Sequence, residues 1–234
     1  MQVAVLSRKV GRQITVVSGE FSEFILLVKT AKELDMQPIV GVRSKMTVKG
    51  RGKWEGSGGD RAKFGLTNSE IINAARYLKE HGMADCLKLL HFHIGSQLTD
   101  IRAVKESITE GAMIYSELHK MGFNLEYVDV GGGLGIDYDG SQSTNDSSRN
   151  YSMQEYVADI VYGMKQVCDL EAVPHPILVS ESGRAITAHH SCVVTEVVGA
   201  IKSHGAGIAT DPADDEHILV SDMRELSEII HKQD

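Results

Sequence analysis

The segment 126–135 reads EYVDVGGGLG, an apolar run of the β type that stops at three consecutive glycines. Tyr127, Val128 and Val130 suit a buried strand, whereas glycine at 131–133 weakens strands and helices alike. Three glycines at the end of a strand predict a backbone that approaches a ligand closely, and their N–H groups favour an anion such as phosphate. A tight turn without a ligand is the alternative interpretation.

The composition is that of an ordinary globular chain, and it narrows the choice of partners. Of the 234 residues, 42% are hydrophobic and 24% are charged, and the formal net charge is −8. The negative charge argues against nucleic acid or an anionic membrane as the main partner, and no apolar run approaches the roughly 20 residues of a membrane span. No signal peptide or transit peptide is recognisable, and three widely spaced cysteines predict a reducing compartment without a CxxC site.

Short β-type runs alternate with amphipathic helical patterns. Strands are predicted at 14–17, 38–42, 87–92, 125–130, 177–180 and 193–200. Helices are predicted over 24–34, from the capping box Thr67-x-x-Glu70 to Gly82, from the cap Asp100 to 118, and from the capping box Ser152-x-x-Glu155 to 167. Residues 46–63 and 139–150 are rich in Gly or in Ser, Asn and Asp, and they predict loops.

Repeated β-then-α units predict parallel strands joined by crossover helices, in either an open doubly wound sheet or a (β/α)8 barrel. The residues that carry chemistry follow several different strands: Arg43, His93, the glycines 131–133 and the segment 181–184. A barrel brings such strand ends together at one mouth, whereas an open sheet spreads them along an edge. We therefore predict an α/β barrel of the TIM type, which is incomplete because only five or six units are recognisable.

His91 and His93 are two residues apart at the end of a strand, so their side chains point to the same side. One interpretation is a zinc pair in a metal-dependent barrel hydrolase. A second is that one imidazole stacks on a flat cofactor while Gly95 or Ser96 helps to hold the phosphate of that cofactor. A third is two histidines with purely structural hydrogen bonds. The later strands offer glycines and the segment 181–184 rather than further metal ligands, which disfavours zinc.

The sequence Glu181-Ser182-Gly183-Arg184 follows a buried strand. A carboxylate at such a mouth is costly unless it is paired, and a protonated heterocyclic nitrogen is one suitable partner. Arg184 is suited to a phosphate or to a substrate carboxylate. A structural ion pair between Glu181 and Arg184 is the alternative.

Four stretches of the chain together resemble the fold-type III pyridoxal phosphate (PLP)-dependent decarboxylases. They are RAKFGLT at 61–67, HFHIGSQ at 91–97, VDVGGGLGIDYD at 128–139 and SESGRAITAHHS at 180–191. Within this superfamily the chain looks most like the biosynthetic arginine decarboxylases of the plant type, through ESGRAITAHHS and the loop KWEGSGGDRAKFG at 53–65. Relatives that act on diaminopimelate share the HIGSQ and triple-glycine motifs, but they typically carry Pro where this chain has Ser182.

The resemblance implies roles for eight cofactor-binding residues. His93 would stack on the PLP ring, Glu181 would face the pyridine nitrogen and keep the ring protonated, and Ser96 would lie near the phosphate. Arg184 would help on the phosphate side, and Arg43 belongs to the same set. Backbone N–H groups would bind the phosphate at Gly131, Gly132 and Gly133. The implied reaction is decarboxylation of L-arginine to agmatine and CO2, the first step of a polyamine route.

Further properties follow from the resemblance alone. Mg2+ is a possible second cofactor, the full-length protein is expected to be a homodimer or a higher oligomer, and the expected location is a plastid or the cytosol. A diaminopimelate or other basic amino-acid decarboxylase is the alternative activity. Residues 1–190 would form a partial PLP-binding barrel, and 191–234 would begin the link to a C-terminal β-domain.

The chain departs from the family in two respects. The Schiff-base lysine of the family sits on an early barrel strand, and no lysine in residues 1–40 has a convincing context for it. The C-terminal β-domain, which supplies a cysteine and substrate-binding acids across a dimer interface, is not evident either. The expectation from sequence is therefore an internal fragment that is inactive alone, or a truncated, catalytically inactive paralogue that binds PLP.

Overall fold

A computed structural model describes residues 1–48, 63–199 and 217–231. The chain divides into two compact units, Met1–Ser191 and Cys192–Asp234. The first unit contains the elements α1 (Gln2–Leu6), β1 (Thr15–Ser18), α2 (Phe21–Glu33), β2 (Ile39–Ser44), α3 (Asn68–Glu80), β3 (Leu87–Phe92), α4 (Ile101–Lys120), β4 (Tyr127–Asp129), α5 (Met153–Glu171), β5 (Ile177–Val179) and α6 (Gly183–Thr187). Two short 3-10 helices, Ser7–Val10 and Ala84–Cys86, precede β1 and β3.

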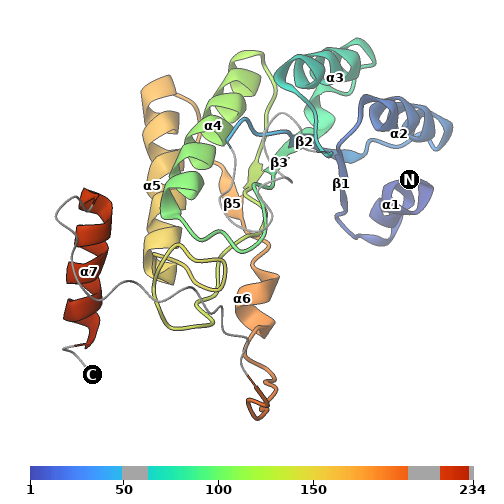
Figure 1. The fold of residues 1–234 in the computed structure, drawn as a ribbon. Coiled ribbons are helices and arrows are strands. Elements are labelled where there is room, and N and C mark those ends of the chain that lie inside the picture. The colour runs from blue at the N-terminus through green and yellow to red at the C-terminus, as the bar shows by residue number, and fades with distance from the viewer. Residues whose placement is uncertain (49–62, 200–216, 232–234) are drawn as a thin grey trace. The chain divides into compact units, whose positions relative to one another are not determined.

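The five strands form one parallel sheet in the order β1-β2-β3-β4-β5. Each strand thus pairs with its neighbour in the sequence, and the order never reverses as it does in a doubly wound sheet. Helices α2 to α5 follow one another around the outside of the strands in Figure 1. The arrangement is that of part of a (β/α) barrel, so the predicted fold class is confirmed, and β1 and β5 are the two edges of the described sheet.

Helices α3, α4 and α5 begin where the sequence predicts, whereas α2 begins at Phe21, ahead of the predicted range 24–34. The helices α1, α6 and α7 were not predicted. The Thr67 and Ser152 side chains accept hydrogen bonds from the N–H groups of Glu70 and Glu155, which completes both predicted capping boxes. The Asp100 side chain caps α4 by accepting from the Arg102 N–H. A third capping box, made by Glu20 and Glu23 at the start of α2, was not predicted from the sequence, because Glu is not among the usual capping residues.

The core lies between the sheet and the outer helices. Phe92 on β3 is fully buried, and it packs directly against Gly111 on α4. The largest fully buried side chains are Tyr115, Phe24, Phe92, Leu27, Leu66, Leu78, Leu87, Leu90, Leu98, Ile108, Leu118 and Met164. Burial of these aliphatic and aromatic groups is the main force that fixes the strand ends in place.

The second unit differs from the sequence-based expectation. The strand predicted at 193–200 is wrong for its described part, because residues 193–199 have no regular secondary structure. Val193, Val194 and Val198 are more than 90% exposed, and no strand in the described residues pairs with this β-branched run. The described remainder of the unit is α7 (Ile218–His231). Whether the unit begins a link to a β-domain stays a prediction.

Two predicted features lie partly or wholly outside the described residues. Most of the loop predicted at 46–63 belongs to the undescribed segment 49–62, as does most of the KWEGSGGDRAKFG stretch. The loop predicted at 139–150 is confirmed, because it consists of bends and turns.

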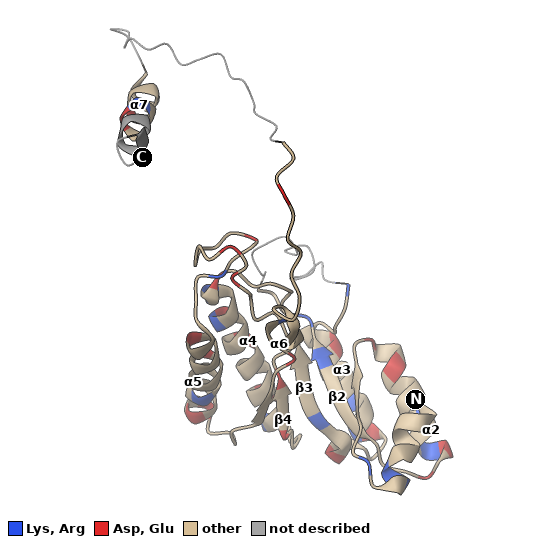
Figure 2. Cartoon of the chain, turned by 90° about the horizontal axis from the view of Figure 1, so that it is seen from below, with Lys and Arg blue, Asp and Glu red and all other residues tan. Residues whose placement is uncertain are grey.

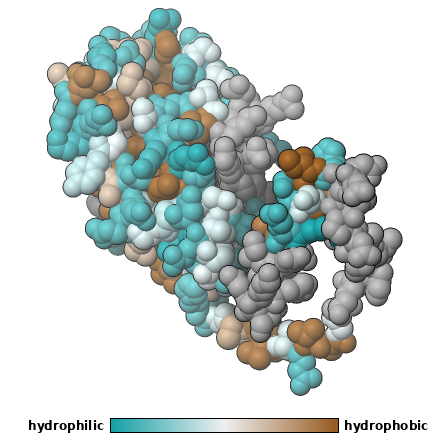
Figure 3. Space-filling view, turned by 60° about the vertical axis from the view of Figure 1, so that its left-hand side comes forward, coloured by the Kyte–Doolittle hydropathy of each residue, from teal (hydrophilic) through white to brown (hydrophobic). Residues whose placement is uncertain are grey.

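Charges of both signs lie on the described surface. Basic and acidic residues are interspersed over α2 to α5 in the view of Figure 2. Hydrophobic residues form separate patches on the face drawn in Figure 3. Among the described residues, no helix combines the length and the apolar character that crossing a membrane requires. The thiols of Cys86, Cys168 and Cys192 are free.

Candidate functional site

The carboxyl ends of all five strands face one cavity of about 390 Å³. Its wall includes one residue at or just after the end of each strand: Val17, Arg43, His91, Asp129 and Glu181. Parallel strands with the same hand of crossover bring these ends together. The strand ends thus converge as predicted, but of the predicted residues only Arg43 and Glu181 line this cavity. His93, the glycines 131–133 and Arg184 do not belong to its described lining.

The loops after β1 and β2 complete the wall of this cavity. Glu20 and Glu23 come from the start of α2, and Lys63 and Phe64 come from the segment before α3. Lys63 is the only lysine in the lining of the cavity, within the part of the chain that the structure describes. The Arg43 guanidinium lies 5.2 Å from the centre of the Phe64 ring, a cation–π contact that orients Arg43 beside the cavity.

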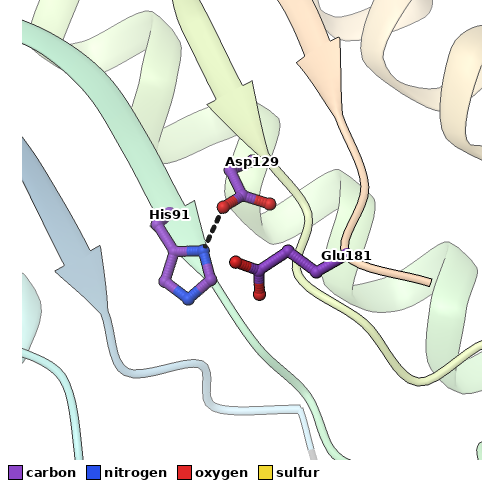
Figure 4. Close-up of side chains that lie close together, drawn as sticks. All are labelled: His91, Asp129 and Glu181. Carbon is purple, nitrogen blue, oxygen red and sulfur yellow. Dashed lines mark hydrogen bonds and ion pairs between the residues drawn. The ribbon is translucent and has the colours of Figure 1, made fainter. Parts of the chain in front are cut away.

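Three ionisable side chains gather at the floor of the cavity. His91, Asp129 and Glu181 come from β3, β4 and the residues after β5, and their nitrogen and oxygen atoms lie within 4.8 Å of one another. Figure 4 shows the Asp129 and Glu181 carboxylates on neighbouring sides of the His91 ring. His91 Nδ1 and Asp129 Oδ2 are 2.9 Å apart, and the two side chains are only 9% and 10% exposed. Asp129 was not singled out in the sequence analysis.

Asp129 also holds the glycine turn. Its Oδ1 accepts a hydrogen bond of 2.9 Å from the Gly131 N–H. Because the carboxylate accepts from both partners, the proton between Asp129 and His91 is carried by His91 Nδ1. One buried acid thus joins β3, β4 and the first glycine of the turn.

His93 joins the same turn from the other side. Its Nδ1 accepts a hydrogen bond of 3.1 Å from the Gly132 N–H, which places the ring proton of a neutral imidazole on Nε2. Burial lowers the pKa of His93 below 6.5, the nearby Arg43 guanidinium lowers it further, and the Glu181 carboxylate acts in the opposite direction. A neutral, half-buried imidazole is well suited to lie against a flat aromatic ring.

The lowered pKa of His93 predicts a pH dependence of stability. Between the pKa of His93 in the folded state and 6.5, its value in the unfolded state, the unfolded state binds more protons. The free energy of unfolding therefore rises with pH over this range. The contribution of His93 is complete above 6.5 and is lost as the pH falls below that value. We expect urea unfolding at about pH 7.5 and about pH 5 to give a larger loss of unfolding free energy for the natural chain than for His93→Gln. An equal loss in both proteins contradicts this assignment.

The triple glycine is required chiefly by the packing of its own backbone. A Cβ at Gly131 would lie 2.5 Å from the Phe92 carbonyl oxygen, and one at Gly132 would lie 2.8 Å from the Glu181 carbonyl oxygen. Gly131 and Gly132 also donate their N–H groups internally, so the predicted phosphate contact from all three glycines is not preformed. Of the three, the N–H of Gly133 alone has no hydrogen-bond partner among the described residues.

Ser96 and Arg184 meet beyond this turn. Arg184 Nη2 donates to Ser96 Oγ at 3.0 Å, and Nη1 donates to the Tyr138 hydroxyl at 3.3 Å. The predicted structural ion pair between Glu181 and Arg184 is absent from the described residues. Guanidinium and hydroxyl donors therefore lie together at an exposed position, and no carboxylate of the described residues forms an ion pair with Arg184.

Two further residues that the sequence analysis passed over support these loops. The Gln97 side chain accepts from the Ile136 N–H and donates to the Ile136 carbonyl. The buried Tyr151 hydroxyl accepts from the Gly135 N–H and donates to the Leu98 carbonyl. Burial raises the pKa of Tyr151 to about 12, so this hydroxyl stays protonated and keeps the segments after β3 and β4 together.

His91 and His93 do not form the zinc pair that was the disfavoured interpretation of their spacing. Within the described residues, His91 lies with Asp129 and Glu181 in a group of side chains whose spacing could hold a metal ion. His93 does not belong to this group, because its Nδ1 accepts a hydrogen bond from the Gly132 N–H. The geometry therefore separates the two histidines into different networks.

Comparison with known proteins identifies relatives of this chain. Residues 2–188 match the family described as "Pyridoxal-dependent decarboxylase, pyridoxal binding domain". The biosynthetic arginine decarboxylase of Bacteroides thetaiotaomicron is 47% identical over 97% of this chain, which covers 35% of that protein. The chain thus spans about a third of the length of this curated relative.

Two solved structures share the fold. The biosynthetic arginine decarboxylase from Campylobacter jejuni superposes with a TM-score of 0.67 and 31% identity, over 78% of this chain and 29% of that chain. The diaminopimelate decarboxylase from M. jannaschii has a TM-score of 0.63 and 27% identity, over 80% of this chain and 42% of that chain. The chain therefore belongs to the pyridoxal-dependent decarboxylase family, whose pyridoxal-binding domain it matches over most of its length.

Proposed function

We propose that this chain forms the PLP-binding barrel portion of an arginine decarboxylase, which converts L-arginine to agmatine and CO2 at the start of polyamine synthesis. The observation that carries the proposal is the convergence of Arg43, His91, Asp129 and Glu181 on one cavity, next to the turn that holds His93. Identity of 47% to a biosynthetic arginine decarboxylase favours arginine as the substrate.

The residues around the cavity suit the two ends of PLP. At the ring end, the neutral His93 imidazole would lie against the ring, and the Glu181 carboxylate would accept a hydrogen bond from the protonated ring nitrogen. At the phosphate end, Arg184 and Ser96 offer charged and neutral donors, and the Gly133 N–H is unused by the described residues. Bound PLP supplies a heteroaromatic ring that accepts the electron pair left when the bond to the departing carboxylate breaks.

The polar contacts of Arg184 support an anion as its natural partner. Among the described residues, its guanidinium donates to the hydroxyls of Ser96 and Tyr138 and forms no ion pair with an acid. A guanidinium binds a phosphate through two parallel charge-assisted hydrogen bonds, which are stronger than bonds to neutral hydroxyls. An arriving phosphate would therefore replace weaker contacts with stronger ones.

Binding measurements with PLP test the phosphate site. We expect Arg184→Gln to bind PLP about 10- to 100-fold more weakly than the natural chain, because one charge-assisted interaction is worth about 1.5–3 kcal/mol. Pyridoxal, which lacks the phosphate, should bind both proteins equally. Arg76→Gln, which changes an exposed arginine on α3, serves as the matched control. Equal affinity of Arg184→Gln and the natural chain for PLP contradicts the assignment.

The substrate is tested on the complete reading frame that contains this chain. We expect that protein, loaded with PLP, to release agmatine from L-arginine and to leave diaminopimelate unchanged. Release of lysine from diaminopimelate would contradict arginine as the substrate and would support the alternative activity, diaminopimelate decarboxylation. PLP binding without either product would support the alternative of an inactive PLP-binding paralogue. Gel filtration of the same protein tests the expected homodimer or higher oligomer.

A further inference from the structure

Asp129 is the most firmly held acid at the floor of the cavity. Its two oxygens accept hydrogen bonds of 2.9 Å from the Gly131 N–H and from His91 Nδ1, and its side chain is 10% exposed. Holding the turn requires only a neutral acceptor such as an amide. The carboxylate places an additional negative charge at a site where burial makes charge costly, and the turn alone does not account for that charge.

The Asp129 carboxylate lies beside a second carboxylate, that of Glu181. The oxygen of Asp129 and that of Glu181 are within 4.8 Å of each other, with a nitrogen of His91 at similar range. The Glu181 carboxylate makes no hydrogen bond or ion pair with any residue in the described ranges, so it does not have a partner of its own to neutralise it. Arg43 and Lys63 also line the cavity, but neither forms an ion pair with these acids in the described part of the chain.

Two neighbouring carboxylates repel each other, and a cation that enters between them relieves the repulsion. The cavity opens directly onto this pair, since both residues belong to its lining. We propose that Asp129 is a second acid for the protonated ring nitrogen of bound PLP and acts together with Glu181, while His91 is the positioning residue that fixes Asp129. This inference rests on the proposed function, because it assumes that the ring nitrogen faces Glu181.

The consequence is a preference for a ring that carries positive charge. PLP has a ring nitrogen that takes up a proton, whereas 1-deazapyridoxal 5′-phosphate has carbon at that position and stays neutral. Both molecules keep the aldehyde and the phosphate, so any covalent or phosphate contribution to binding cancels in the ratio of their affinities. The ratio therefore isolates the interaction of the site with the ring nitrogen.

The experiment measures both affinities by calorimetry for the natural chain, Asp129→Asn, Glu181→Gln and the control Asp146→Asn, which changes an exposed loop acid. All solutions contain a chelator, because a divalent cation would occupy the same three side chains. We expect Asp129→Asn to lower the affinity for PLP about 5- to 10-fold, the effect of one charge at a partly screened site, with less than about 2-fold change for the deaza compound. Asp146→Asn should change neither affinity.

Each other outcome has a definite meaning. If Asp129→Asn weakens both compounds equally, Asp129 serves only to hold the turn, and the inference is overturned. If Glu181→Gln alone lowers the preference for PLP, the cofactor placement stands and the inference about Asp129 fails. If neither variant changes the ratio, the ring nitrogen does not meet these acids, and the placement of PLP in the proposed function fails as well.

Discussion

Replacing Gly131 by alanine is expected to destabilise the first unit by about 2–5 kcal/mol, which is a large part of the stability of a typical domain. Gly131 has a φ of +69°, where an L side chain is strained. The new Cβ would also lie 2.5 Å from the Phe92 carbonyl oxygen and 2.8 Å from His93 Nδ1. The nearer obstacle is backbone of a central strand, so the clash is not relieved by rotating a side chain.

Gly140→Ala is the matched control for this prediction. Gly140 has a similar φ of +75°, but an added Cβ there meets nothing within 4 Å. Urea unfolding should therefore give a loss of about 1–2 kcal/mol for Gly140→Ala, from backbone strain alone, and a clearly larger loss for Gly131→Ala. Equal losses would mean that the approach of Phe92 does not constrain the turn. Because Gly131 and Gly132 bind Asp129 and His93, the Gly131 variant should also weaken PLP binding.

The five strands and the longer helices of the first unit were predictable because their signals are local, whereas the short helices α1 and α6 were not predicted. Each of the capping boxes at Thr67 and Ser152 indicates, within four residues, where a helix begins. The periodicity of the apolar residues indicates which face of the helix is buried. Parallel pairing followed from the alternation of strands and helices, since parallel neighbours require crossover connections. The ends of the five strands were predicted to within two residues.

The failure at residues 193–199 has the opposite cause. A run of valines has a high β propensity, but a strand exists only when another strand supplies its hydrogen bonds. No described strand pairs with this segment, and Val194 and Val198 are almost fully exposed. Local sequence gives the propensity and not the partner, so such a prediction fails wherever the pairing is missing.

The candidate site was predictable in its position but not in its internal bonding. The motif residues His93, Ser96 and Arg184 stood out because histidine, serine and arginine follow strands where ligands bind. Asp129 did not stand out, because it lies inside an apolar strand and reads as part of the strand pattern. Its importance depends on the register that places it beside His91, a contact across 38 residues of sequence. The same limit applies to Gly132, whose N–H meets His93 rather than solvent.

The packing of Phe92 against Gly111 supports the second prediction of large effect. Phe92→Ala is expected to cost about 3–5 kcal/mol of unfolding free energy, because the ring is fully buried at the centre of the sheet and its removal leaves a cavity. Phe92 also belongs to the strand that carries His91, and its carbonyl oxygen bounds the Gly131 turn. Loss of this ring should therefore loosen the floor of the cavity together with the core.

A second substitution tests whether this contact is responsible. In the natural chain, a Cβ at Gly111 would lie 2.7 Å from Phe92 Cζ and closer still to Cε1, so Gly111→Ala should destabilise by about 1–3 kcal/mol. In the Phe92→Ala background the obstacle is gone, and the same change should stabilise by about 1 kcal/mol, because alanine favours a helix over glycine and fills part of the cavity. The sign of Gly111→Ala should thus reverse between the two backgrounds, as a double-mutant cycle of urea unfolding measures directly. If Gly111→Ala stays destabilising in the Phe92→Ala background, α4 closes onto β3 when the ring is lost. If it is stabilising in both backgrounds, the Phe92 ring does not exclude a Cβ at Gly111.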